Sequence, residues 1–90
     1  MPRDLQTPET IRVRELLGSR IRTLRIAAQL TQEDLSEQVG IDRKTINRVE
    51  NGTMGCTVDQ LVLIARALGR KPSDMLRFRD ADRPGDPGHG

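Results

Sequence analysis

A group of cationic and polar side chains between residues 43 and 48 is the part of this sequence whose residue types and spacing could do chemistry. On a helix, which turns by about 100° per residue, these side chains share one face, whereas Ile46 and Val49 fall on the other. The members of the face are Arg43, Lys44, Asn47 and Arg48. Arginine and lysine suit the paired acceptors of guanine, and asparagine suits adenine. The face therefore predicts contacts to DNA bases, and the alternative is an ordinary solvated helix face.

The residues before this face predict how it is positioned. Thr31 can cap a short helix by accepting a hydrogen bond from the amide of Asp34. Gly40 can end that helix in the left-handed conformation, and Asp42 offers a second N-cap only two residues later. No room remains for a long loop. The pattern predicts two short helices joined by a tight turn, which is a helix-turn-helix.

The same stretch strongly resembles the helix-turn-helix of the lambdoid phage repressor and Cro family. Thr-Gln-x-x-Leu at 31–35, Val-Gly at 39–40 and Ile-x-x-x-Glu-x-Gly at 46–52 carry the resemblance, which extends from about Leu17 to Leu76. It implies an all-α, five-helix repressor-like domain whose second and third helices form the helix-turn-helix. It also implies a transcriptional regulator, such as a repressor, that places the third helix in the major groove of double-stranded DNA.

The resemblance also assigns roles to single residues outside the cationic face. It implies that Gln32, first in its helix, reaches a DNA phosphate, with Thr45 and Asn51 as further contacts to the DNA backbone. It matches Arg25 to an arginine that pairs inside the domain with the glutamate ending the third helix, here Glu50. The pair is therefore expected to be structural.

The rest of the chain is also predicted to be helical, because no alternation of β-branched and polar residues suggests a strand. Thr7-Pro8-Glu9 can open a first helix, although Gly18 is an alternative start. Its apolar stripe would consist of Val13, Leu17, Ile21, Leu24 and Ala28. Thr57 and Gln60 form a capping box for a fourth helix, and Pro72 opens a short fifth one. The predicted fold class is all-α.

Length and composition predict a single small domain. Of the 90 residues, we expect 1–7 to be flexible, 8–79 to form the helix-turn-helix domain, and 80–90 to be a disordered tail. The tail carries three aspartates against one arginine, so the net charge of +2 for the chain becomes +4 for the rest. Excess positive charge is weak support for nucleic-acid binding by itself. Its placement on the third helix carries more weight.

Enzymatic and metal chemistry have little support in this sequence. Cys56 is the single cysteine and His89 the single histidine, so no zinc ligand set can be assembled, and no cofactor is expected. Neither a paired-carboxylate site nor a glycine-rich phosphate loop is evident. Cys56 is interpreted as a small apolar residue. No apolar run has the length of a signal or membrane segment, so we expect a cytoplasmic protein that does not enter a membrane.

A homodimer is expected, because one short helix reads too few base pairs for useful specificity. Met75, Leu76 and Phe78 are candidates for the contact between subunits, and packing over the domain's own core is the equal alternative. An inverted repeat would then be the preferred site. A different class of function remains open, in which the protein is an antitoxin bound to a toxin or an accessory factor bound to a polymerase subunit.

Overall fold

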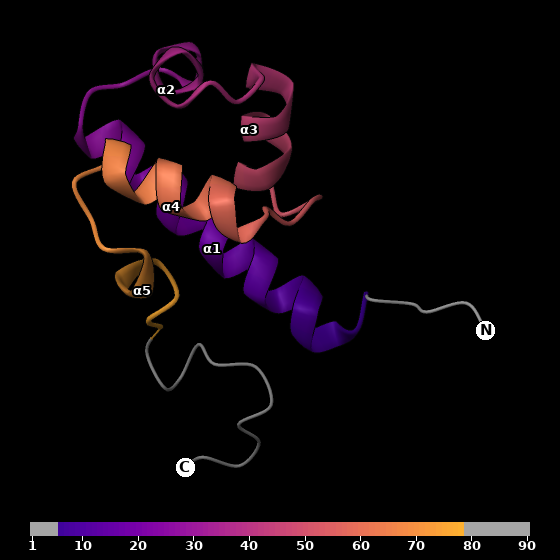
Figure 1. The fold of residues 1–90 in the computed structure, drawn as a ribbon. Helices are drawn as coiled ribbons and strands as arrows, with labels where there is room; N and C mark the ends of the chain where they lie inside the picture. Colours follow the sequence, from indigo (N-terminus) through magenta and orange to yellow (C-terminus); the bar gives the residue numbers. More distant parts are fainter. Residues whose placement is uncertain (1–5, 79–90) are drawn as a thin grey trace.

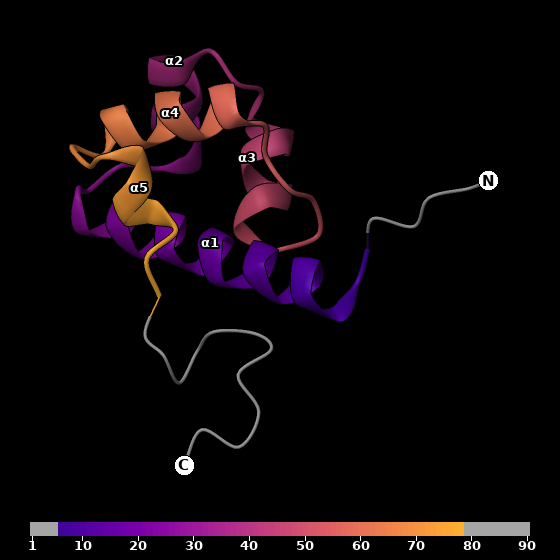
Figure 2. The ribbon, with the colours of Figure 1, turned by 60° about the horizontal axis from the view of Figure 1, so that its bottom comes forward.

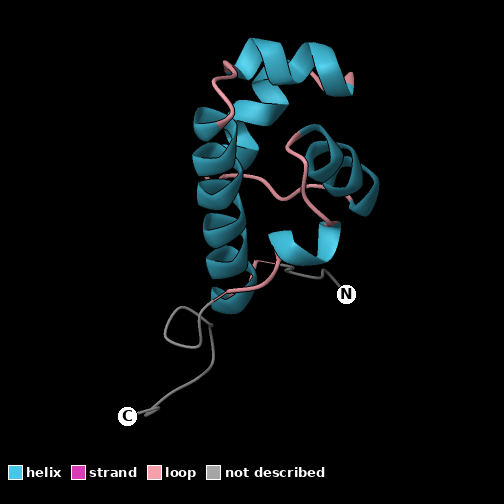
Figure 3. Ribbon diagram, turned by 90° about the vertical axis from the view of Figure 1, so that its left-hand side faces the viewer, coloured by secondary structure: helices cyan, strands magenta, loops and turns pink. Residues whose placement is uncertain are grey.

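The computed structural model describes residues 6–78, which form five α-helices and, within that range, no strand (Figure 3). The helices are α1 (Pro8–Ala27), α2 (Gln32–Val39), α3 (Arg43–Glu50), α4 (Val58–Ala67) and α5 (Pro72–Met75). The predicted all-α class is confirmed. Of the predicted flexible N-terminus, 1–7, only Gln6 and Thr7 are described, and the predicted disordered tail, 80–90, lies outside the described residues.

The helices pack around one apolar core. The long α1 passes behind α4 in Figure 1 and lies along one side of the molecule in Figure 2. Helix α3 lies between α1 and α2 and contacts both, while α4 contacts α2 and α5 (Figure 2). The buried apolar residues are Leu17, Ile21, Leu35, Ile41, Ile46, Val49, Leu61, Ile64, Ala65 and Met75. Every helix contributes at least one of them. The position of α3 therefore depends on a framework built from all five helices.

Helix α1 takes the longer of the two predicted forms. It begins at Pro8 after Thr7, whose hydroxyl accepts a hydrogen bond from the amide of Thr10 at 3.1 Å. The prediction that Ala28 belongs to the apolar stripe of the first helix is wrong, because the helix ends at Ala27 and Ala28 is exposed in the turn that follows. Gln29 adopts a left-handed φ of 61° there, a conformation that costs a residue with a side chain more than it costs glycine.

Gly18 allows a close approach between α1 and α3. A Cβ atom at this position would lie 2.2 Å from the carbonyl oxygen of Val49 and 2.7 Å from that of Glu50. These are backbone atoms at the end of α3, so they cannot move aside as a flexible side chain would. The absence of a side chain at residue 18 therefore sets the distance at which α3 lies on α1.

Arg25 and Glu50 form a buried ion pair between the ends of α1 and α3. The guanidinium donates from Nε to Glu50 Oε2 at 2.6 Å and from Nη2 to Oε1 at 2.9 Å, and its Nη1 donates to the carbonyl of Leu30 at 2.8 Å. Only 8% of Arg25 and 6% of Glu50 are exposed. The hydrogen bond to Glu50 raises the pKa of the Arg25 guanidinium, which is held in its charged form. The pair fixes the last turn of α3 in orientation as well as in position.

Gly18→Ala is expected to destabilise the protein, although the same change in an unobstructed helix gains about 0.5–1 kcal/mol. The methyl group would force α1 and α3 apart, and such overpacking costs about 1–3 kcal/mol. Thermal unfolding followed by circular dichroism measures the sign of the change. Ser19→Ala, at the exposed neighbouring position, is the matched control and should not lower Tm. An increase in Tm for Gly18→Ala would show that α3 does not approach α1 this closely.

Glu50→Ala is expected to reduce the free energy of unfolding by about 3–5 kcal/mol, because it leaves the Arg25 guanidinium buried without its counter-charge. Denaturant titration measures this loss. Arg77→Ala is the control, since Arg77 pairs with Asp74 at 3.8 Å with 73% of its side chain exposed, and such a pair contributes about 0–1 kcal/mol. A Glu50→Ala protein as stable as the wild type would contradict the structural role of the pair.

Candidate nucleic-acid interface

Helix α2 starts with the predicted cap at Thr31. The Thr31 hydroxyl accepts from the amide of Asp34 at 2.9 Å, and the Asp34 carboxylate accepts from the amide of Thr31 at 2.9 Å. These two bonds form a reciprocal capping box. The bond from the Thr31 amide also lowers the pKa of Asp34, because it favours the charged carboxylate. The first turn of α2 is thereby ordered, with the backbone amides of Gln32 and Glu33 at its free end.

A turn of three residues joins α2 to α3. Gly40 takes a left-handed φ of 71°, and the Ser36 hydroxyl donates to the carbonyl of Ile41 at 2.5 Å. The buried side chain of Ile41 anchors the same turn in the core. Asp42 is the N-cap of α3, as predicted, but its side chain makes no capping hydrogen bond. Sequence reasoning missed the hydroxyl of Ser36, which takes part in holding the turn.

Helix α3 has the two faces that its residue order predicts. Ile46 is 1% exposed and Val49 3% exposed, and both belong to the core. The opposite face carries Arg43, Lys44, Asn47 and Arg48, all of them exposed. Together these four residues line an open hollow of about 350 Å³ on the protein surface. The structure therefore gathers three positive charges and one carboxamide on the outer side of a single helix.

The end of α3 is closed by backbone and side-chain bonds. Gly52 has a left-handed φ of 75°, whereas Asn51 stays right-handed with a φ of −82°. The Thr53 hydroxyl donates to the carbonyl of Arg48 at 3.1 Å, and so does the Thr53 amide at 3.0 Å. The last turn of α3 is thus held from the loop side as well as by the ion pair of Glu50.

The side chain of Gln32 lies against α3. Its Nε2 donates to Glu50 Oε1 at 3.1 Å, and its Oε1 accepts from Asn47 Nδ2 at 3.2 Å. Asn47 Oδ1 in turn accepts from Asn51 Nδ2 at 3.2 Å. Neither the residue spacing nor the resemblance pointed to these bonds between α2 and α3.

The other residues singled out in the sequence are distributed unevenly. Thr45 is half-buried and Asn51 is exposed. Met75 has no exposed surface, so its side chain belongs to the core of the chain and cannot meet a second copy in this arrangement. Leu76 is 47% exposed. Phe78 is half-buried and packs on the core. Its ring lies under the guanidinium of Arg20, with 5.3 Å between Arg20 Cζ and the ring centroid.

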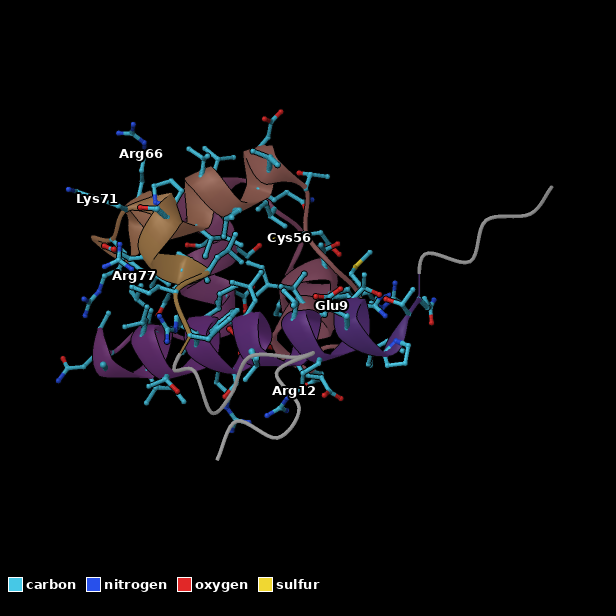
Figure 4. The ribbon with its side chains drawn as sticks, turned by 90° about the horizontal axis from the view of Figure 1, so that it is seen from below. Glu9, Arg12, Cys56, Arg66, Lys71 and Arg77 are labelled. Atoms are coloured by element: carbon cyan, nitrogen blue, oxygen red, sulfur yellow. The ribbon has the colours of Figure 1, made fainter. Side chains whose placement is uncertain are left out.

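Positive charge also occurs away from α3. Arg66, Lys71 and Arg77 point outward where α4 and α5 meet (Figure 4), and all three are exposed. They come from the end of one helix, a connecting loop and the segment after α5. They therefore do not line one face of a helix that could enter a groove, as the cations of α3 do.

Cys56 is half-buried against the core (Figure 4), and this burial raises the pKa of its thiol. The thiol is therefore held in its neutral, less reactive form. Among residues 6–78, no group of three histidine, cysteine, aspartate or glutamate side chains could hold a metal ion. No helix in that range is both long and apolar enough to span a membrane.

Known proteins share both the sequence pattern and this fold. A helix-turn-helix family profile matches residues 21–75. The control protein C.BamHI of Bacillus amyloliquefaciens is 33% identical over 70 residues, which are 77% of this chain and 86% of that protein.

Two solved structures are similar. The restriction-modification controller protein C.AhdI of Aeromonas hydrophila has a TM-score of 0.67 at 32% identity, covering 69% of this chain and 94% of that one. The hypothetical transcription factor NHTF of Neisseria has a TM-score of 0.72 at 26% identity, covering 90% and 91%. These relationships indicate a regulator, not an enzyme. The chain belongs to the Cro/C1-type helix-turn-helix family and is a small transcriptional regulator.

Proposed function

We propose that this regulator binds double-stranded DNA sequence-specifically by placing α3 in the major groove. The observation that carries the proposal is the exposed face of α3, formed by Arg43, Lys44, Asn47 and Arg48. A helix with its side chains is about 10–12 Å across, and the major groove is about 12 Å wide. The two arginines and the lysine suit guanine, and Asn47 suits adenine, so each half of the site should contain G·C pairs.

Contacts to the DNA backbone would come from the start of α2. Thr31, Gln32, Glu33 and Arg43 all line a second open surface hollow. The backbone amides at the N-terminus of α2 point out of that helix end and attract a phosphate. Arg43 adds a positive charge beside them. Thr45 and Asn51 are proposed as further contacts to the backbone, and such contacts set the register of α3 in the groove.

We also propose that two copies bind together on an inverted repeat. One helix of eight residues reads only a few base pairs, which gives too small a specificity ratio against competing DNA. A two-fold axis would place the half-site centres about one helical turn, roughly 34 Å, apart. Since Met75 is buried, Leu76 and the partly covered Phe78 are the members of the candidate patch that a second copy could contact.

Repression is the regulatory outcome that needs the fewest further contacts. A dimer seated in two successive major grooves would exclude other proteins from the same DNA by occupancy alone. The similarity to C.BamHI and C.AhdI supports a place among the control proteins of restriction-modification systems. That assignment concerns the regulated genes, and the DNA-binding proposal does not depend on it.

Replacing Arg43, Lys44 or Arg48 singly by alanine should weaken binding to the preferred site by about 1–3 kcal/mol, with much less lost on random DNA. The reason is that a base contact distinguishes sequences, whereas a phosphate contact does not. The site is first selected from a random duplex pool, and affinities are then measured by band shift.

Arg66→Ala is the matched control for these substitutions, because it removes an exposed arginine where α4 meets α5, away from α3. It should leave the preference between selected and random DNA unchanged. Equal losses on both kinds of DNA for the α3 variants would contradict base contacts and leave phosphate roles only.

The selected site should be an inverted repeat bound by two copies. If the dimer neutralises some 6–10 phosphates, affinity should fall by about 10³–10⁵ between 50 and 200 mM salt. Band-shift titrations on whole and half sites, with light scattering of the free protein, measure both properties. Leu76→Asp should weaken association, because it places a charge in the proposed contact. Tight one-to-one binding to an isolated half-site would remove the dimer from the mechanism.

A further inference from the structure

A chain of side-chain hydrogen bonds leads from the buried ion pair to the exposed face of α3. Glu50 Oε1 accepts from Arg25 Nη2 at 2.9 Å and from Gln32 Nε2 at 3.1 Å. Gln32 Oε1 accepts from Asn47 Nδ2 at 3.2 Å, and Asn47 Oδ1 accepts from Asn51 Nδ2 at 3.2 Å. This series of hydrogen bonds runs from α1 to α3, then to α2, and back to α3, so it links three helices at the site.

The chemistry of Glu50 fixes the direction of every bond in this chain. Both oxygens of the Glu50 carboxylate accept hydrogen bonds from the Arg25 guanidinium, and a carboxylate in such an ion pair can only accept hydrogen bonds. Gln32 must therefore turn its NH₂ group toward Glu50 and its oxygen toward Asn47. That oxygen requires the NH₂ group of Asn47, which leaves Asn47 Oδ1 facing Asn51. An inverted carboxamide at either residue would place two acceptors or two donors against each other.

Asn47 keeps the groups needed to read a base. One hydrogen of its Nδ2 and one lone pair of its Oδ1 are not used by Gln32 and Asn51, since a carboxamide offers two donors and two acceptor positions. A free donor and a free acceptor match the N7 acceptor and N6 donor of adenine. Of the Gln32 side chain, only the second Nε2 hydrogen is left for a phosphate.

We infer that Gln32 is a positioning residue, which holds the Asn47 carboxamide in a defined orientation and so determines discrimination at the base pair that Asn47 meets. This inference rests on the proposed DNA-binding function. Ordering the carboxamide before binding removes a conformational cost that a freely rotating asparagine on the surface would incur. Specificity at one base pair is thereby tied, through Gln32, to the ion pair that holds the fold together.

Gln32→Met tests the inference, because methionine keeps the length of the side chain and removes both of its hydrogen-bonding groups. Gln38→Met, the same change at an exposed position of α2, is the matched control. Affinity is measured for the selected site and for every single-base variant of it. The base pair whose preference is lost in Asn47→Ala is the position that Asn47 reads. In Gln32→Met, discrimination at that position should fall from about tenfold or more to less than about threefold. Positions read by the arginines and the lysine should keep theirs.

The double variant Gln32→Met/Asn47→Ala should discriminate at that position no worse than Asn47→Ala alone. An unchanged profile in Gln32→Met, or an equal loss at every position, would overturn the inference, since the latter indicates a phosphate contact or a general structural role. If Gln32→Met fails to fold, Asn51→Ala decides, because it removes the other bond to Asn47 from an exposed position and should relax the same base pair.

A measurement without DNA separates this inference from the function on which it rests. Side-chain amide relaxation by nuclear magnetic resonance should show an ordered Asn47 NH₂ group in the free wild-type and Gln38→Met proteins and a mobile one in Gln32→Met. Equal mobility in all three proteins would refute the positioning role. If the wild-type protein enriches no duplex, the proposed function fails, and this measurement still decides whether Gln32 orders Asn47.

Discussion

The buried ion pair of Arg25 with Glu50 is the interaction on which the rest of this structure depends. It joins the end of α1 to the end of α3, and the same guanidinium also holds the carbonyl of Leu30 in the turn that leads to α2. A buried charge tolerates little displacement, because separating the partners leaves each of them poorly solvated. The pair therefore acts as a geometric constraint: α2 and α3 are held in one arrangement relative to α1.

This constraint explains how a helix of eight residues can present a defined face. Isolated helices of that length are unstable in water, so α3 depends on its surroundings for its conformation. Gly18 allows its carbonyls to lie directly on α1, Ile46 and Val49 bury its inner side, and Glu50 is locked to Arg25. The outer side of α3 is not needed to hold the fold, apart from the hydrogen bonds of Asn47. The cations on that side can serve recognition without weakening the fold.

Much of this architecture could be predicted from the sequence, because the local signals are strong. Capping residues such as Thr31 and Thr57 marked two helix starts, and the order of apolar and cationic residues placed the two faces of α3. The first helix remained ambiguous, since Gly18 is a poor helix former and its contact with α3 is a tertiary feature that no local pattern reveals. Ala28 fitted the apolar period but lies beyond the end of the helix.

The details of the site were less accessible from the sequence. The bond of Ser36 to Ile41 and the bonds of Gln32 to Glu50 and Asn47 depend on how α2 and α3 meet in space. Asp42 had the right residue type for a cap, yet its side chain makes no such bond. Met75 was a candidate for the contact between subunits, and it is instead fully buried. Short-range patterns cannot separate these outcomes, since packing decides them.

The most direct test of the account is to map the DNA contact surface by nuclear magnetic resonance, titrating labelled protein with the duplex that it selects from a random pool. Signals of the Arg43 and Arg48 side chains and of the backbone amides at the start of α2 should change first and most. Signals from Arg66 and Lys71, where α4 and α5 meet, should stay in place. Changes concentrated on those two residues, with α3 unaffected, would contradict the claim that α3 is the surface that reads DNA.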